Sequence, residues 1–418
     1  MPPLSVMFKT VSTDCNLDCA YCYYRESLEG VRARRRLDLR LLERVIPAYM
    51  AYVADVGMAS VSWQGGEPTL AGLPFFEKVV SLQTAHARPG TVISNALQTN
   101  GILLDDAWGA FLGHHYWLVG VSLDGPEAVH DALRRDRGGR GSFARVMRGI
   151  EVLRRHRVEF NILCVVGPHN VERAGELMAF FRGQGFSHVQ FIPAMDFQAT
   201  EPDRPATFLI TPIQYGAFLV EAFEAWYQSG LPTVSIRTFD NFLQSLTGLP
   251  NELCVHADTC DAGIVIEADG FVYPCDFFIH PAWRLGNVLE TPMAELVAHP
   301  VRRAFVSGKR PLPEACAACE WLHLCKGGCS RNRRTTETGS GPDHFCESYR
   351  QLFRHASDRL GTLAGAIRNK QRYLGLLEIE PGRAQRTGRN DPCPCGSGWK
   401  HKACCANPAQ ARSYLFHA

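Results

Sequence analysis

Short apolar runs alternate with longer amphipathic stretches from residue 5 to about residue 195. The runs at 5–11, 61–64, 92–98, 118–122, 160–166 and 189–192 predict strands. Between them, apolar residues recur every three or four positions over 41–49, 143–153 and 174–181, which is typical of helices, and Ser142 is expected to be an N-cap. Six strand–helix units in a row predict an α/β fold whose parallel sheet curls into a partial or complete barrel.

Polar residues follow four successive predicted strands. A cysteine-rich loop follows the first, and the next three ends read Gln64-Gly65-Gly66-Glu67-Pro68, Gln98-Thr99-Asn100 and Ser122-Leu123-Asp124-Gly125. Barrels of this kind carry their chemistry at the carboxyl ends of the strands, so this edge predicts the site. The glycine pair lets a ligand approach the backbone, and Glu67 offers an acceptor for an ammonium group. Taken alone, the same segment would be a turn with an exposed acid.

The pattern is less regular beyond residue 195. We interpret 195–250 as a connector with one amphipathic helix over 218–226. Residues 262–288 predict a hairpin that turns at Asp269-Gly270, and 347–385 predict a helix. A separate tail follows Gly382.

Composition narrows the class of protein. With 418 residues, 46% of them hydrophobic, the chain can bury a large core and form two or three domains. A net charge of +2 argues against a general nucleic-acid-binding role. No apolar run approaches the length of a membrane span and the first residues lack an export signal, so we expect a cytoplasmic protein.

Sixteen cysteines are many for a cytoplasmic protein, and in a reducing compartment clustered cysteines indicate metal sites. Fifteen of them fall in three groups, over 15–22, 254–346 and 393–405. The remaining one, Cys164, lies in an apolar run and is expected to be a buried small hydrophobe.

The first group, Cys15-x3-Cys19-x2-Cys22 with Tyr21 before the last cysteine, supplies three ligands where an iron–sulfur cluster normally takes four. One iron would then stay open for a ligand from outside the chain. The alternative is a structural zinc loop completed by a distant histidine. The motif resembles the signature of radical S-adenosylmethionine (SAM) enzymes, in which the open iron chelates SAM and reduces it to a 5′-deoxyadenosyl radical.

The second group contains eight cysteines, enough for two four-cysteine sites that by count alone could hold zinc or iron–sulfur clusters. The segments 325–329 and 273–275 resemble the SPASM extension of radical SAM enzymes, which carries two auxiliary [4Fe-4S] clusters for electron transfer. That resemblance implies two interleaved ligand sets: Cys254, Cys260, Cys275 and Cys329 in the first, and Cys316, Cys319, Cys325 and Cys346 in the second.

The third group supplies four soft ligands around a Gly-Ser-Gly turn, which suits one tetrahedral Zn²⁺: Cys393, Cys395, Cys404 and Cys405. It resembles the SEC-C zinc motif. With all four positions filled, the expected role is docking, and the export machinery is one candidate partner.

The longer motifs over residues 5–370 resemble anaerobic sulfatase-maturating enzymes. They are Trp63-Gln64-Gly65-Gly66-Glu67-Pro68-Thr69, Leu97-Gln98-Thr99-Asn100-Gly101, Val121-Ser122-Leu123-Asp124-Gly125-Pro126, Phe160-Asn161-Ile162-Leu163 and Tyr273-Pro274-Cys275-Asp276-Phe277. The resemblance implies oxidation of a sulfatase cysteine or serine to Cα-formylglycine, with Asp276 as the base. A carboxylate beside a cluster can take up a proton as the electron leaves.

The same resemblance implies further site residues and partners. The SAM contacts it implies are Tyr21, Gly66, Ser122, Arg134 and Met195. Contacts with the substrate peptide are expected from Tyr24, Gln64 and Asn100. The expected partners are an unfolded sulfatase polypeptide and an electron donor such as flavodoxin or ferredoxin.

We expect three units: a partial (β/α)6 radical SAM barrel over 1–230, a SPASM domain over 231–370 and the zinc motif over 386–408. Two other functions compete with sulfatase maturation. One is a different SPASM peptide modification, a thioether or carbon–carbon crosslink. The other is a non-enzymatic metal or adaptor protein that binds through its zinc tail.

Overall fold

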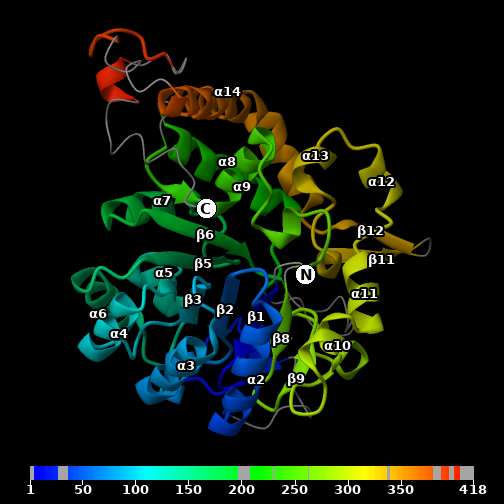
Figure 1. Cartoon of the computed structure of the whole chain (residues 1–418). Helices are drawn as coiled ribbons and strands as arrows, with labels where there is room; N and C mark the ends of the chain where they lie inside the picture. Colours follow the sequence, from blue (N-terminus) through cyan, green and yellow to red (C-terminus); the bar gives the residue numbers. More distant parts are fainter. Residues whose placement is uncertain are drawn as a thin grey trace.

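A computed structural model of the protein describes residues 4–26, 36–195, 208–228, 230, 232–261, 263–336, 339–379, 387–394 and 400–404. Its centre is a ten-stranded sheet in the order β10-β9-β8-β1-β2-β3-β4-β5-β6-β7 (Figure 1). The strands are β1 (Ser5–Lys9), β2 (Met58–Gln64), β3 (Val92–Thr99), β4 (Leu118–Ser122), β5 (Phe160–Val166), β6 (His188–Pro193), β7 (Ser235–Ile236), β8 (Ile264–Ile266), β9 (Phe271–Tyr273) and β10 (Gly286–Asn287). A second sheet pairs β11 (Arg333–Thr336) with β12 (Gly339–Asp343).

Strands β1 to β7 are parallel, and helices connect them. The helices of this half are α1 (Tyr23–Glu26), α2 (Leu39–Tyr52), α3 (Leu73–His86), α4 (Asp106–His114), α5 (Glu127–Leu133), α6 (Phe143–Arg155), α7 (Ala174–Gly183), α8 (Pro212–Tyr227) and α9 (Arg237–Thr247). The six strands and the helices expected from the hydrophobic pattern are therefore confirmed. The sheet has two ends and does not close on itself among the described residues, so the barrel is partial.

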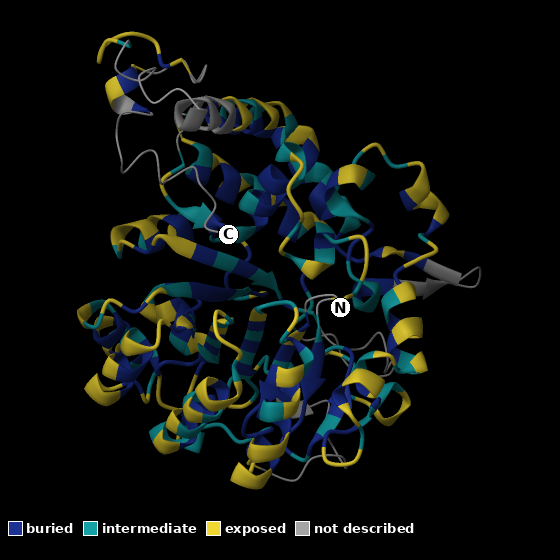
Figure 2. Cartoon of the chain, in the orientation of Figure 1, coloured by how far each residue is buried: buried dark blue, intermediate teal, exposed yellow. Residues whose placement is uncertain are grey.

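Each strand presents one face to the helices. In β2, Ala59, Val61 and Trp63 are buried, whereas Ser60, Ser62 and Gln64 between them are half-exposed. Figure 2 shows the same division across the molecule, with buried strands inside and the outer faces of the helices exposed. Because successive side chains of a strand point to opposite faces, the polar set faces the barrel interior at the edge where the predicted site lies.

Two expectations need correction. Ser142 precedes α6 as predicted, but its side chain caps nothing: its hydroxyl donates to the carbonyl of Arg134 at 2.8 Å. Instead, Asp131 Oδ1 accepts from the amides of Ser142 and Phe143 at 2.7 and 2.9 Å. The expected connector over 195–250 also holds more structure than one helix, since β7 and α9 follow α8. A two-residue strand is too short for its periodicity to be seen in the sequence.

The chain after α9 returns to the sheet through the predicted hairpin. Strand β8 pairs in parallel with β1, with Phe8 opposite Ile266, and β9 pairs antiparallel with β8. The remaining helices are α10 (Met293–Val297), α11 (Pro300–Ser307), α12 (Glu314–Ala317), α13 (Leu322–Cys325) and α14 (Cys346–Ile379). The long α14 packs along α8 and α9 (Figure 1). Within the described part of the chain, none of the helices combines the length and the apolar character that a bilayer crossing needs.

Candidate active site

The loop with Cys15, Cys19 and Cys22 follows β1 and is bound along its length to the α5–α6 connection. The amide of Asp18 donates to the carbonyl of Arg135 at 2.7 Å, and that of Ala20 to Leu133 at 3.0 Å. Burial raises the pKa of the Cys15 thiol to about 12 and that of Cys19 to about 11, and the neighbouring thiols contribute to both shifts. The three thiols thus share one partly buried pocket, and iron binding would release their protons.

Gly66 lies directly against this loop. Its φ is +50°, and a Cβ there would stand 1.9 Å from the carbonyl oxygen of Asp14. The next residue, Glu67, donates its amide to the same carbonyl at 2.8 Å. The cysteine loop and the glycine turn, which together we call the cradle, pack so closely that no side chain fits at Gly66. A backbone without a side chain is also what a ligand can approach.

The Glu67 carboxylate serves the chain itself. Glu67 is buried, and its carboxylate accepts four hydrogen bonds, from Thr69 N and Oγ1, Thr99 Oγ1 and Asn100 N, at 2.6 to 3.0 Å. Three of them reach Oε1 and one reaches Oε2, and together they join the ends of β2 and β3. Its expected role as an acceptor for an ammonium group stays a prediction.

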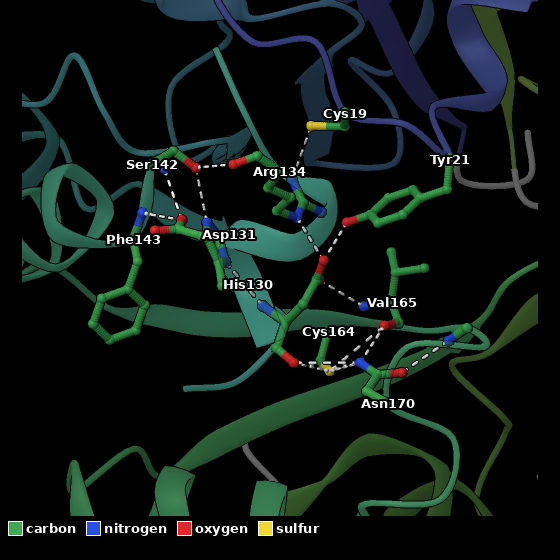
Figure 3. A network of polar contacts seen from close by, with 12 residues as sticks. Cys19, Tyr21, His130, Asp131, Arg134, Ser142, Phe143, Cys164, Val165 and Asn170 are labelled. Carbon is green, nitrogen blue, oxygen red and sulfur yellow. Dashed lines mark hydrogen bonds and ion pairs between the residues drawn. The ribbon is translucent and has the colours of Figure 1, made fainter. Parts of the chain in front are cut away.

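The buried carboxylate of Asp124 joins Tyr21, Arg134 and Val165, three residues of the polar network that Figure 3 shows. Its Oδ2 accepts from Arg134 Nε at 2.9 Å and from the hydroxyl of Tyr21, while Oδ1 accepts from the amide of Val165 at 3.0 Å. Burial opposes its ionisation, but the charge of Arg134 and these hydrogen bonds hold the pKa of Asp124 below its ordinary value. Asp124 thereby fixes both Tyr21 and Arg134, two of the predicted SAM contacts.

Arg134 extends this network to the cysteine loop. Its guanidinium lies 5.3 Å from the centre of the Tyr21 ring, and Nη1 is 3.9 Å from Cys19 Sγ. The ring of Tyr21 also stacks on His169, with a centroid distance of 6.1 Å. The Tyr21 side chain, which directly precedes the third loop cysteine, is thus flanked by a cation and an aromatic ring.

The other predicted contacts occupy the same edge of the sheet. Ser122 is buried at the end of β4, and Met195 is half-buried after β6. Gln64 ends β2, and Asn100 donates to Asn16 Oδ1 at 2.7 Å beside the cysteine loop. The hydroxyl of Tyr24 donates to Glu267 Oε1 at 2.8 Å, so it is engaged within the chain. Their contacts with SAM or peptide stay predictions.

Asp276 is where the barrel meets the later cysteines. Its Oδ2 accepts from the hydroxyl of Tyr23 at 3.0 Å and lies 3.6 Å from Lys9 Nζ, while Cys275 Sγ is 3.6 Å from Oδ1. Lys9 ends β1 and is almost fully buried, and Tyr23 directly follows Cys22. One carboxylate therefore touches the first strand, the first cysteine loop and the later cysteines.

The eight later thiols fall into two groups by their mutual effects. Burial raises the pKa of Cys254 to about 11, and the charges of ionised Cys329 and Cys260 add to this rise. Burial also raises the pKa of Cys275, and the charges of Cys329 and Cys254 add to that rise. Likewise burial and then Cys316, Cys325 and Cys319 raise the pKa of Cys346 to about 11. Among the described residues, no three His, Cys, Asp or Glu side chains converge on a single-ion position. A cluster that gives each thiolate its own iron needs only that the thiols be neighbours.

The tail is described in part. Cys393 and Cys404 are buried, and Cys393 Sγ lies 3.6 Å from His401 Nδ1. Cys395 and Cys405 lie outside the described residues.

Three residues of this site, Asp124, Lys9 and Tyr23, are hard to find from the sequence. Asp124 is one of several polar residues at a strand end, and Tyr23 is an aromatic residue after Cys22 that belongs to no motif. Lys9 carries the one usable signal, because it is a lysine at the end of an apolar strand.

Comparisons with known proteins agree with this geometry. Residues 10–181 match the model of the radical SAM superfamily, 259–320 that of an iron–sulfur cluster-binding domain, SPASM, and 389–407 that of the SEC-C motif. A cysteine-type anaerobic sulfatase-maturating enzyme of Clostridium perfringens is 37% identical over 373 residues, covering 88% of this chain and all of the relative. A serine-type enzyme of Bacteroides thetaiotaomicron is 34% identical over 394 residues, covering 90% and 95%.

A solved structure shows the same overall shape. Native anSMEcpe with bound AdoMet and the Cp18Cys peptide superposes with a TM-score of 0.81 at 37% identity, covering 88% of this chain and all of that one.

Proposed function

The chain belongs to the anaerobic sulfatase-maturating enzymes of the radical SAM superfamily, and on that premise we propose that it oxidises an active-site cysteine or serine of a sulfatase polypeptide to Cα-formylglycine. Iron–sulfur clusters and SAM are its cofactors. When bound, they supply a 5′-deoxyadenosyl radical that takes a hydrogen atom from the substrate β-carbon and a cluster that accepts the remaining electron.

The position of Asp276 carries the proposal. Its carboxylate adjoins Cys275 and is held by Tyr23 and Lys9 at the mouth of the barrel. A base at this point removes the thiol or hydroxyl proton where the electron departs, so that charge does not build up on the substrate. The Lys9 ammonium group and the Tyr23 hydroxyl together hold the carboxylate in place.

The cofactor ligands follow from the groups described above. Cys15, Cys19 and Cys22 would hold the cluster that binds SAM, with Tyr21, Gly66, Ser122, Arg134 and Met195 around the SAM molecule. The two later thiol groups would hold two auxiliary clusters, making three in all. The thiols of each group neighbour one another, and all of them except that of Cys254 are at least half-buried. The buried ammonium group of Lys309, which donates to the carbonyl of Cys254, fits an anionic cluster in the first of these groups.

The finer assignments are part of the same proposal. They are a barrel over 1–230, a SPASM domain over 231–370, a Zn²⁺-binding tail over 386–408, a flavodoxin- or ferredoxin-type electron donor, an export-machinery partner for the tail and a cytoplasmic location.

The test uses paired peptides that differ only in cysteine or serine at the target position. Each is incubated anaerobically with the enzyme, SAM and a reductant, and its mass is measured. An aldehyde-reactive product supports the proposal, and an intramolecular link supports the crosslinking alternative.

Asp276→Asn tests the base directly. We expect this variant to cleave SAM while making at least tenfold less aldehyde, and Cys19→Ala to do neither. Full aldehyde yield from Asp276→Asn would refute the assignment.

A further inference from the structure

Lys309 is a fully buried lysine in the loop between α11 and α12. Its ammonium group donates to three backbone carbonyls: Cys254 at 3.1 Å, Val255 at 3.2 Å and Ala257. None of the ion pairs of the described residues joins it to a carboxylate. A buried cation normally needs an opposite charge, because carbonyl dipoles replace only part of its hydration.

The negative charge that this ammonium group can face comes from the cysteine set next to Asp276. Its hydrogen bond to the carbonyl of Cys254 places it on the backbone of one of these four cysteines. The charges of Cys260, Cys329 and Cys254, three of the four thiols in the set, act on it. Lys309 therefore binds the loop that carries Cys254 and faces the anionic site that this loop helps to form.

The backbone of Lys309 is held in place as well as its ammonium group. The carbonyl of Lys309 accepts from Arg333 Nη1 at 2.9 Å, and Arg333 Nη2 donates to Gly327 at 3.2 Å, in the segment between Cys325 and Cys329. Arg333 is itself buried. The lysine is thus fixed rather than free to turn away into solvent.

We propose that Lys309 is the fixed counter-charge of the cluster bound by Cys254, Cys260, Cys275 and Cys329, and that it raises the reduction potential of that cluster. A nearby cation stabilises the reduced state more, since reduction adds one negative charge. In the proposed reaction the hydrogen atom would go to the 5′-deoxyadenosyl radical and the proton to Asp276, so that an auxiliary cluster would take up only the remaining electron. Lys309 is a positioning and tuning residue and touches no substrate.

This inference rests on the proposed function only in that the cluster must be present. Wild-type iron and sulfide are therefore counted first: a protein without auxiliary iron would overturn both proposals, whereas unchanged potentials in a protein with full iron would overturn only the role of Lys309. The potentials are measured by EPR-monitored redox titration in a Cys15→Ala/Cys19→Ala/Cys22→Ala background, so that only the two auxiliary clusters contribute.

Lys309→Met and Lys309→Gln remove the charge, and Gln keeps a donor for the carbonyls. We expect the midpoint potential of one auxiliary cluster to fall by at least 59 mV, which is a tenfold change in the one-electron equilibrium constant. The potential of the other cluster should stay the same. Lys309→Arg should leave both potentials unchanged. Arg310→Met is the matched control, because Arg310 is the next residue but is half-exposed and pairs with Asp258.

Unchanged midpoint potentials in Lys309→Met or Lys309→Gln, with full iron content, would overturn the inference. If neither neutral variant keeps its iron while Lys309→Arg does, the requirement for a positive charge stands. Loss of the cluster in Lys309→Arg as well would show that shape alone matters and would also overturn it.

Discussion

At the scale of single residues, Asp124 shows how one carboxylate arranges a pocket. It is inaccessible to solvent and engages Arg134, Tyr21 and the amide of Val165. Tyr21 comes from the cysteine loop and Arg134 from the end of α5, so the carboxylate connects segments over a hundred residues apart in the sequence.

Asp124→Asn should therefore destabilise the protein and weaken SAM binding together. Leaving Arg134 buried without its partner costs about 3–5 kcal/mol in comparable cases, and Tyr21 and Arg134, both predicted SAM contacts, lose their anchor. Urea unfolding and equilibrium SAM binding measure the two effects. Asp106→Asn is the control, because its pair with Arg155 is exposed, and equal losses in the two variants would contradict the role of Asp124.

Gly66→Ala probes the cradle. A methyl group would collide with the carbonyl of Asp14, so we expect SAM affinity to fall at least tenfold. Gly57→Ala has a similar positive φ of +71° but meets no atom within 4 Å, so it should cost only backbone strain of about 1–2 kcal/mol. Wild-type SAM affinity in Gly66→Ala would show that the turn adapts.

At the scale of elements, His130 joins β4, α5 and α6. Its Nδ1 accepts from the amide of Asp124 at 3.3 Å, and its Nε2 lies 2.9 Å from Ser142 Oγ, which itself donates to Arg134. This chain of hydrogen bonds requires a neutral ring with the proton on Nε2. It explains why the Ser142 hydroxyl is not free to cap α6.

The stability of the protein should fall on mild acidification through this ring. Burial lowers the pKa of His130 from 6.5 to about 4. Between these values the unfolded chain binds the proton and the folded chain does not, so stability is full above pH 6.5 and is lost as the pH falls toward 4.

The loss attributable to His130 is about 1 kcal/mol between pH 7.5 and 5.5. Urea midpoints at the two pH values measure it in the wild type and in His130→Gln, which cannot take up the proton. The variant should show a flatter pH dependence by that amount. If the wild type and His130→Gln lose the same stability between the two pH values, the pH dependence comes from other groups.

At the scale of the whole molecule, the sheet continues past the barrel. Strand β8 pairs with β1, so the hairpin that leads to Cys275 and Asp276 is held against the strand that ends in Lys9. The region expected as a second domain thus shares its hydrogen-bonded framework with the first. Transfer of a proton and an electron from one substrate requires this closeness.

The tail follows that framework in the sequence, and its described residues, 387–394 and 400–404, contribute no strand to the ten-stranded sheet. Ending the chain after residue 386 should remove one zinc ion per protein, because the four predicted ligands lie beyond it, and should leave aldehyde formation unchanged. Metal analysis of both forms together with the peptide assay tests this. The same zinc content in both would contradict a zinc site in the tail.

The sequence by itself determined the alternation of strands and helices, the edge of the sheet that carries the site, and the spacing of three loop cysteines, because each depends on residues close together in the chain. Only the tertiary structure decided that Glu67 serves the sheet, that Asp124 anchors Tyr21 and Arg134, and that Lys9 and Tyr23 meet Asp276. Likewise, nothing near Lys309 in the sequence indicates its surroundings. Each of these joins side chains from distant segments, and their burial and charge depend on which segments the fold brings together.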